Sequence, residues 1–239
     1  MRQRQRYLIA LLITLSAICI AGVFLIVDGP ESAANSDARS SPAYVLPSVN
    51  RGDSDLLEAI HNRRSTRSYG TGPLSSEDLA VLLWSTIGTT VDSVSGPTRA
   101  APSAGATNPL EIYVAVEEVE SLTPGVYRYI PHRHHLEMVS EGRIGERLSE
   151  AALQQLSVAD APVTIVIAAE FRRTTARYGD RGVRYVHFEA GHASQNLVLV
   201  AESLGLGSVI IGAFNDRMVS DLIRSGSEEP LLLIPIGPF

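Results

Sequence analysis

Six consecutive positions, Arg63 to Ser68, hold three arginines, two serines and a threonine. They follow one helical pattern and precede another, in a chain whose net charge is −6. Two interpretations are open: a solvated turn, which is the usual state of a short charged run, or a binding site for an anion. Guanidinium groups present planar forks of donors and the hydroxyl groups add more, so this composition suits a phosphate.

A loop of small residues is the second stretch that could bind a ligand. It contains Pro102, Ser103, Ala104 and Gly105, and it leads directly into an alternating, β-forming segment at 111–116. Small side chains let a flat ligand approach the backbone closely. The alternative is an ordinary loop rich in proline and glycine.

A third stretch, residues 204–214, contains glycines that do not form a dinucleotide-binding fingerprint. Gly205 and Gly207 follow a helical pattern and precede a strand pattern, which is the reverse of the order that the fingerprint requires. They are more simply a helix C-cap and a tight turn. Gly212 and Ala213 lie at the end of the predicted strand, where backbone N–H groups are free to face a ligand.

The histidines give a weaker signal. His132, His134 and His135 lie at one predicted hairpin tip with no further ligand at helical spacing, so we interpret them as solvated rather than metal-binding. His192 follows Gly191 in a long helical pattern and is predicted to be an interior, hydrogen-bonded histidine. No metal site is therefore expected.

Composition limits the classes of function. The chain has 239 residues and is 45% hydrophobic. Its acidic balance argues against nucleic acid as a partner, because that partner needs a broad basic face. Cys19 is the only cysteine, so the globular part has no disulfide framework, no cysteine metal site and no thiol catalysis.

The N-terminal sequence predicts a membrane anchor. Arg2, Arg4 and Arg6 precede an uncharged apolar run from residue 8 to residue 27. At about 1.5 Å of rise per residue, a helix of that length spans the roughly 30 Å hydrocarbon core of a bilayer. A cleaved signal peptide is the alternative, although its apolar core is usually shorter. The arginines place the N-terminus in the cytoplasm and the remainder on the outer side of the membrane.

Three segments and an α+β domain follow from these patterns. Residues 1–27 are the arginine-rich tip and transmembrane anchor, 28–52 a linker and 53–239 the globular domain. Ser75 is the predicted N-cap of a helix that Gly88 closes, and Trp84 within it is predicted to be core. Helices are predicted at 55–62, 75–88, 143–155, 184–205 and 215–225, and strands at 111–116, 125–130, 135–140, 161–170, 208–212 and 230–237. The run at 161–170 is apolar throughout, which predicts a central strand.

Together these stretches resemble the nitroreductase-like FMN flavoproteins and, within them, the SagB-type dehydrogenases. "RRSTRSY" at 63–69 resembles the opening Arg-x-Ser-x-basic motif of the family, and "PSAGATNPLEIYV" at 102–114 its small-residue loop and following strand. The segment 184–214 resembles the long helix and the strand after it, and 228–237 the closing strand. The resemblance covers about residues 54–239. It implies a nitroreductase-like fold, with a mixed, mostly antiparallel central sheet flanked by helices and preceded by one transmembrane helix.

The resemblance also implies a cofactor site. FMN would be held at its phosphate and at the polar edge of its ring by Arg63, Arg64, Ser65 and Arg67. A cation near the ring would tune its redox potential as well. The ring would lie along Pro102, Ser103, Ala104 and Gly105, with the amide of Asn108 nearby. The backbone N–H groups of Gly212 and Ala213 would point at N5. The family usually builds this site at a homodimer interface, so each flavin would touch both chains.

Two departures from the family pattern bear on the reaction. No basic residue follows the last strand, so phosphate binding would rest on Arg63 and Arg64. Azoline-oxidising members carry Lys-Tyr ahead of the long helix, where this chain has Arg177 and Tyr178. Arginine does not deprotonate at working pH and cannot act as a general base, which argues against azoline oxidation. Tyr178 is a candidate proton donor; the alternative is a structural tyrosine.

We therefore expect a membrane-anchored, FMN-dependent oxidoreductase. Hydride would reach the flavin from NAD(P)H or from the substrate itself, and electrons would pass to a second small-molecule or peptide substrate. The alternative is a non-catalytic, membrane-tethered flavin- or nucleotide-binding accessory protein. The predicted topology places the domain outside the cytoplasm, where FMN and NAD(P)H are found. Therefore FMN is exported, or the electron donor is not NAD(P)H, or the N-terminus lies on the outer side instead.

Overall fold

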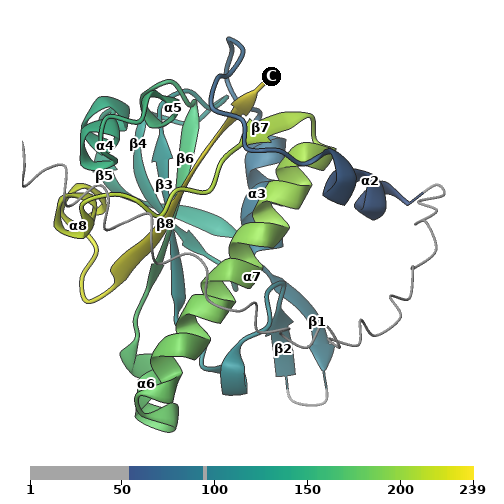
Figure 1. The fold of residues 1–239 in the computed structure, drawn as a ribbon, viewed down its shortest axis with the longest axis vertical. Helices are drawn as coiled ribbons and strands as arrows, with labels where there is room; N and C mark the ends of the chain where they lie inside the picture. The colour runs from purple at the N-terminus through teal and green to yellow at the C-terminus, as the bar shows by residue number, and fades with distance from the viewer. Residues whose placement is uncertain (1–53, 94–95) are drawn as a thin grey trace, which may run out of the picture. The chain divides into compact units, whose positions relative to one another are not determined.

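The computed structural model describes residues 54–93 and 96–239. The helices are α2 (Asp55–Asn62), α3 (Ser76–Ile87), the 3-10 turn η1 (Ala104–Ala106), α4 (Gly145–Ala151), α5 (Leu156–Ala159), α6 (Arg172–Tyr178), α7 (Arg181–Ser203) and α8 (Asp216–Ile223). The strands are β1 (Thr89–Ser93), β2 (Gly96–Arg99), β3 (Leu110–Val116), β4 (Gly125–Ile130), β5 (His135–Glu141), β6 (Val163–Ala169), β7 (Leu206–Ser208) and β8 (Glu229–Pro238). Figure 1 shows their arrangement.

One six-stranded sheet organises the domain. Its order is β5-β4-β3-β6-β8-β7, and every neighbouring pair is antiparallel. Alternate side chains of β6 divide between two cores: Ile165 and Ile167 face the core that includes α3 and α7, whereas Val166 and Ala168 face the core that includes α4 and α8. Burial on both faces explains the apolar sequence of β6 and confirms the predicted central strand.

Helix α3 begins and ends as predicted. The Asp78 N–H donates to Ser75 Oγ at 3.0 Å. The Gly88 N–H donates to the Trp84 carbonyl at 2.8 Å, and a Cβ at Gly88 would clash with that residue. Local capping chemistry therefore fixes both ends of this helix.

Ser75→Ala should lower the free energy of unfolding by about 1 kcal/mol, because it leaves an N-terminal N–H of α3 without its acceptor. Chemical denaturation measures the change. Ser76→Ala is the matched control, since the Ser76 hydroxyl is exposed and, within the described part of the chain, bonds only to the neighbouring Glu77 carboxylate. An equal loss of unfolding free energy in both variants would show that the Ser75 cap does not stabilise α3.

Other predicted elements differ from the structure. The helix predicted at 143–155 ends at Ala151, because Leu153 and Gln154 adopt left-handed φ values of 58° and 63°. The strand predicted at 208–212 ends at Ser208, and Ile211 pairs separately with Leu233. The β1–β2 hairpin and α6 were not predicted.

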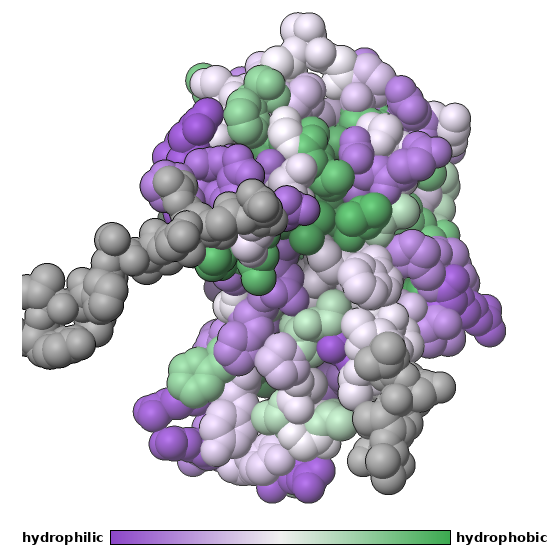
Figure 2. Space-filling model, turned by 90° about the vertical axis from the view of Figure 1, so that its right-hand side faces the viewer, coloured by the Kyte–Doolittle hydropathy of each residue, from purple (hydrophilic) through white to green (hydrophobic). Residues whose placement is uncertain are grey.

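Several large hydrophobic side chains stay exposed on α2, α3 and α7: Leu56, Ile60, Val81, Trp84, Val183 and Phe188. Trp84 was predicted to be core, but it is 45% exposed and its indole N–H donates to the Thr89 carbonyl at 3.1 Å. Figure 2 views the side of the molecule where α2 adjoins α7, and hydrophobic atoms gather in its upper half. Grouped exposure of this kind is typical of a surface that another protein covers.

The expected membrane anchor requires a correction. Within residues 54–93 and 96–239, no helix is both long and apolar enough to cross a bilayer. The predicted anchor at 8–27 itself lies outside the described residues, as do residues 28–53. The prediction that a transmembrane helix belongs to the fold was therefore wrong. We withdraw the membrane localisation and the membrane partner that were inferred from it.

Candidate functional site

The arginine-rich segment, residues 63–68, forms a turn against the edge strand β7; we call it the arginine turn. Ser65 forms a parallel bridge with Ser208, and the Thr66 N–H donates to the Ser208 carbonyl at 2.9 Å. The Tyr69 hydroxyl, just beyond the turn, donates to the Pro235 carbonyl on β8 at 3.2 Å. Burial raises the pKa of Tyr69, so this donor stays protonated at neutral pH. The turn is thus fixed to the β7–β8 end of the sheet.

The arginines of this turn have no anionic partner within the described part of the chain. Arg64 and Arg67 are exposed and Arg63 is half-buried. None of the three pairs with a carboxylate among residues 54–93 and 96–239. The Arg64 guanidinium instead lies 5.1 Å from the centroid of the Phe239 ring. Three guanidinium groups held at one strand edge fit an anion such as a phosphate.

The second predicted group lies in residues 102–108, which we call the serine loop. Gly105, Ala106 and Asn108 have left-handed φ values of 59°, 56° and 44°. Glycine tolerates this conformation, whereas the other two residues must be held in it. Ser103 Oγ accepts the Asn108 N–H at 2.9 Å, and Asn108 Nδ2 donates to the Ala106 carbonyl at 3.0 Å. The Asn108 amide is therefore turned onto its own loop.

Helix α6 holds the serine loop from one side. Arg177 Nη1 donates to the Gly105 carbonyl at 3.0 Å, and the Thr174 and Thr107 hydroxyl oxygens are 2.8 Å apart. The Tyr178 hydroxyl lies so near Gly105 that a Cβ there would clash with it. The candidate proton donor Tyr178 is thus brought to the loop, and the left-handed φ of 59° favours glycine at position 105.

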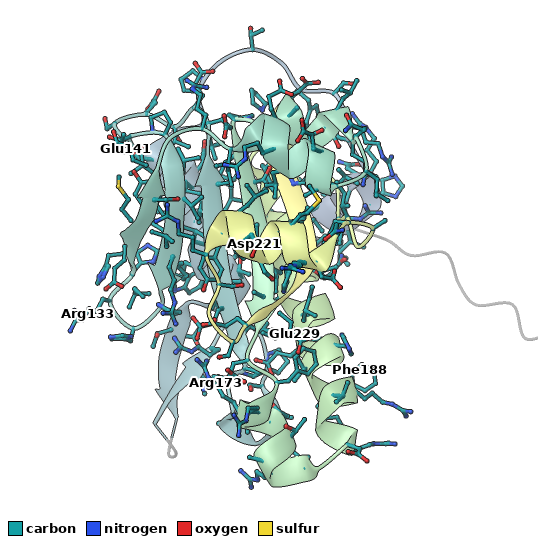
Figure 3. All side chains as sticks on the ribbon, turned by 90° about the vertical axis from the view of Figure 1, so that its left-hand side faces the viewer. Arg133, Glu141, Arg173, Phe188, Asp221 and Glu229 are labelled. Carbon is teal, nitrogen blue, oxygen red and sulfur yellow. The ribbon has the colours of Figure 1, made fainter. Side chains whose placement is uncertain are left out.

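Arg173, labelled in Figure 3, ties the same loop to the sheet. Its guanidinium donates to the Asn108 carbonyl at 2.9 Å and to Glu111 Oε1 at 2.6 Å. Arg128 donates to the other Glu111 oxygen at 2.8 Å. Glu111 is only 8% exposed, and these two guanidinium groups compensate its buried charge.

Glu189 on α7 is a candidate functional residue that the sequence did not reveal. Glu189 is only 5% exposed and lies beside Ser103 and Ala104 of the serine loop. Burial raises the pKa of Glu189 to about 7, although the nearby Ser103 side chain and Ala104 backbone act to lower it. The sequence does contain one signal for this residue, namely its position on the helix. Glu189 lies three residues after Val186 and four before Ala193, both of which are buried, so it shares their buried face.

Glu189→Gln should flatten the pH dependence of stability. The folded-state pKa of about 7 exceeds the ordinary glutamate pKa of 4.5, so the folded protein keeps a proton that the unfolded chain releases. The stabilisation is complete below about pH 4.5 and is lost as the pH rises to about 7. Denaturation across this window should show a smaller decline in the neutral variant and a higher relative stability above it.

Glu202→Gln on the same helix is the matched control for this titration and should keep the wild-type decline. A Glu189→Gln variant whose stability followed the wild-type curve at every pH would show that Glu189 titrates alike in the folded and unfolded states.

The third predicted group follows β7. Ile211 and Leu233 exchange backbone hydrogen bonds of 2.8 and 2.9 Å, and Gly212 and Ala213 come next, both exposed. Gln155 Nε2 donates to the Ala213 carbonyl at 3.2 Å. The N–H groups of Gly212 and Ala213 have no hydrogen-bond acceptor among the described residues, so they are available to a ligand.

A single chain therefore places the predicted residues in two separate regions. The arginine turn pairs with β7, and residues 212–213 follow β7 along the same side of β8. The serine loop and Tyr178 lie toward the other end of α7. Glu189, which contacts the serine loop, and Ser203 at the end of α7 are separated by about 21 Å of helix rise. In Figure 1, α2 lies near one end of α7 and α6 near the other.

The remaining candidates lie apart from both groups. His192 is exposed on α7 rather than interior as predicted, and His134 Nδ1 is 2.8 Å from the Tyr129 hydroxyl oxygen at the hairpin tip. No group of three or more potential metal ligands occurs among the described residues. A cavity of about 230 Å³ between α3 and the β4–β5 hairpin is lined by His134 and His135, but by no residue of the arginine turn, the serine loop or the 212–213 segment.

The sequence model of the nitroreductase family matches residues 60–238. The chain belongs to the nitroreductase family. A candidate nitroreductase of Methanocaldococcus jannaschii is 45% identical over 182 residues, which cover 76% of this chain and 90% of that protein. Trifolitoxin-processing protein TfxB of Rhizobium leguminosarum bv. trifolii is 30% identical over 185 residues, covering 71% of this chain and 48% of TfxB.

The solved structure of a candidate nitroreductase from Anabaena variabilis matches this nitroreductase-family fold with a TM-score of 0.69 and 30% identity. The match covers 80% of this chain and 39% of the Anabaena chain, so this chain spans about half of TfxB and less of that protein. The resemblance seen in the sequence is confirmed, as is the α+β nitroreductase-like fold. Members of the family are generally FMN-dependent oxidoreductases.

Proposed function

We propose that this nitroreductase-family protein is an FMN-dependent oxidoreductase whose site is shared between two copies of the chain. The observation that carries the proposal is the arginine turn, with three guanidinium groups that lack a carboxylate partner among the described residues, on the same strand edge as the free N–H groups of residues 212–213. Bound FMN would supply hydride exchange at its N5 atom.

The arginine turn would bind the cofactor at its anionic end. Arg63, Arg64 and the Ser65 hydroxyl would donate charge-assisted and neutral hydrogen bonds to the phosphate. Arg67 would hold the polar edge of the ring, where a cation stabilises negative charge on reduction. The Gly212 and Ala213 N–H groups would orient the reactive edge of the ring.

The serine loop would come from the second copy of the chain. Within one protomer that loop is separated from the arginine turn by most of the length of α7. The helices between the two groups, α2, α3 and α7, carry the exposed hydrophobic side chains that a homodimer would bury. A twofold arrangement places the arginine turn of one chain against the serine loop of its partner.

The electron donor and the second substrate are proposed as classes. NAD(P)H or an oxidisable substrate would provide hydride, and a small molecule or a peptide would receive the electrons; the likeness to TfxB supports the peptide class. Arg177 is a permanent donor already bonded to the Gly105 carbonyl, which argues against a general base at that position. Tyr178 remains the candidate proton donor.

An absorbance spectrum of the purified full-length protein tests the proposal. We expect flavin absorption bands that persist after gel filtration with added FMN, bleach when a reductant is added and return in air. A protein that stays colourless after incubation with FMN would overturn the oxidoreductase assignment. A protein that binds FMN but cannot cycle it would indicate the accessory flavin-binding role instead.

A further inference from the structure

We propose that the cavity between α3 and the β4–β5 hairpin is a second binding site, for a small neutral molecule that has an apolar ring and a hydroxyl group. The site is separate from the arginine turn, the serine loop and residues 212–213, none of which lines it. The proposal therefore goes beyond the FMN-dependent reaction, and it holds whether or not the chain binds a flavin.

Mainly apolar side chains from three parts of the chain line this cavity. They are Leu79 and Leu83 on α3, Val119 and Leu122 between β3 and β4, and Leu136 on β5. The cavity volume is about 230 Å³. An engineered apolar cavity of about 150 Å³ binds benzene in another protein, so this cavity is large enough for a molecule with one ring.

A buried tyrosine determines which nitrogen of a neighbouring histidine carries the proton. The Tyr129 hydroxyl oxygen lies 2.8 Å from His134 Nδ1, and both residues line the cavity. Tyr129 is 1% exposed, and within the described part of the chain its hydroxyl has no other hydrogen-bond partner. A buried hydroxyl hydrogen needs an acceptor, so Tyr129 donates to Nδ1. The neutral imidazole of His134 then carries its proton on Nε2, which offers a donor to a ligand.

The polar groups of the wall favour a neutral hydroxyl over a charged group. Glu120 also lines the cavity, and its carboxylate forms no ion pair among residues 54–93 and 96–239. A ligand hydroxyl can accept from His134 Nε2 and donate to an acceptor such as Glu120. A ligand carboxylate would be repelled by Glu120, and an ammonium group has no lone pair for His134, so neither suits both residues.

The backbone of the cavity wall is strained at two of its residues. Ser121 and His134 have left-handed φ values of 60° and 49°. Glycine tolerates this conformation, whereas other residues adopt it at a cost in free energy. Such residues concentrate at ligand-binding sites, where their surroundings hold them. A ligand contact therefore accounts for the histidine at position 134, where the backbone alone would favour glycine.

Fluorine NMR titrations of the full-length protein without FMN test the chemistry of the site. The probes are 4-fluorophenol, fluorobenzene and 4-fluorobenzoate, which share one ring. We expect 4-fluorophenol to bind up to about tenfold more tightly than fluorobenzene, because its hydroxyl adds a hydrogen bond. The benzoate should bind more weakly than the phenol, because Glu120 repels its charge. Equal affinities for 4-fluorophenol and fluorobenzene would overturn the proposal.

Two variants test the position of the site. Ala80 lines the cavity, so Ala80→Phe should fill it and abolish binding of 4-fluorophenol. Ala176→Phe is the matched control, because Ala176 is exposed on α6 and does not line the cavity. Thermal unfolding shows whether each variant is folded. Binding that survives in a folded Ala80→Phe protein would overturn the site.

His134→Gly keeps the test decisive if Ala80→Phe does not fold, because glycine tolerates the left-handed turn. It should lower the affinity for 4-fluorophenol to that for fluorobenzene, whereas His132→Gly, at an exposed residue of the same tip, should change neither. Unchanged affinity for 4-fluorophenol in His134→Gly would overturn the assigned donor.

A titration in the presence of FMN separates this site from the cofactor site, because a flat ring can also stack on a flavin. We expect the same affinity for 4-fluorophenol with and without FMN. Displacement of the probe by FMN would place it in the cofactor site and overturn the second site. If the protein binds no FMN, the proposed function fails, and the titrations without FMN still decide the second site.

Discussion

Arg63→Ala/Arg67→Ala should abolish FMN binding while leaving the protein folded. A hydrogen bond to a charged group contributes about 1.5–3 kcal/mol, so losing two guanidinium groups should weaken binding by at least about 100-fold. The fold should survive, because neither side chain forms an ion pair among the described residues. Titration of flavin fluorescence measures the FMN affinity, and thermal unfolding measured in parallel shows whether the variant is folded.

Arg133→Ala/Arg147→Ala is the matched control. Both arginines are exposed, one at the β4–β5 tip and one on α4, and their removal changes the net charge by the same amount. Equal weakening in the control would mean that overall charge, rather than the arginine turn, governs FMN binding. Unchanged binding in the Arg63→Ala/Arg67→Ala variant would return the turn to the role of a solvated loop.

The parts of the fold that could be predicted are those that local chemistry determines. The boundaries of α3 follow from the Ser75 cap and from Gly88, which are local signals. The central strand β6 follows from its apolar run, because both faces of the sheet are covered there. In each case the information lies within a few residues of the element.

Helix α6 could not be predicted because its stability is tertiary. It spans seven residues, includes two threonines, and has no side-chain cap at Phe171. Such a segment is a poor isolated helix. Contacts with the serine loop hold it instead, through Arg177 and Thr174. The left-handed Leu153 and Gln154, which end α4 early, likewise give no local signal of the glycine type.

The candidate site divides in the same way. Residue types predicted the arginine turn and the serine loop as binding segments, because guanidinium clusters and small-residue loops have direct chemical meaning, and that prediction awaits the FMN-binding measurements. Their separation along α7 could not be read from the sequence, nor could the burial of Glu189 beside the serine loop. Both depend on how a helix far along the chain packs against loops near its beginning.

That separation allows the shared site to be tested by complementation. Arg63→Ala/Arg67→Ala removes the arginine turn but leaves the serine loop intact. Gly105→Val leaves the arginine turn intact but disrupts the loop, because a β-branched residue is strained at a left-handed φ of 59° and its side chain would also displace the ends of Tyr178 and Arg177. Homodimers of either variant should fail to bind FMN.

A heterodimer of the two variants should recover one site. In one of its two interfaces both the turn and the loop are damaged, and in the other both are intact, so two-tag purification should yield about one FMN per heterodimer. A heterodimer of the Arg63→Ala/Arg67→Ala chain with an unmodified chain is the control for purification and should bind about one FMN, because the unmodified chain keeps both its turn and its loop. A purified heterodimer without flavin would show that each site lies within one chain. The loops of that chain would then have to rearrange to bring the arginine turn and the serine loop together, although they lie toward opposite ends of α7.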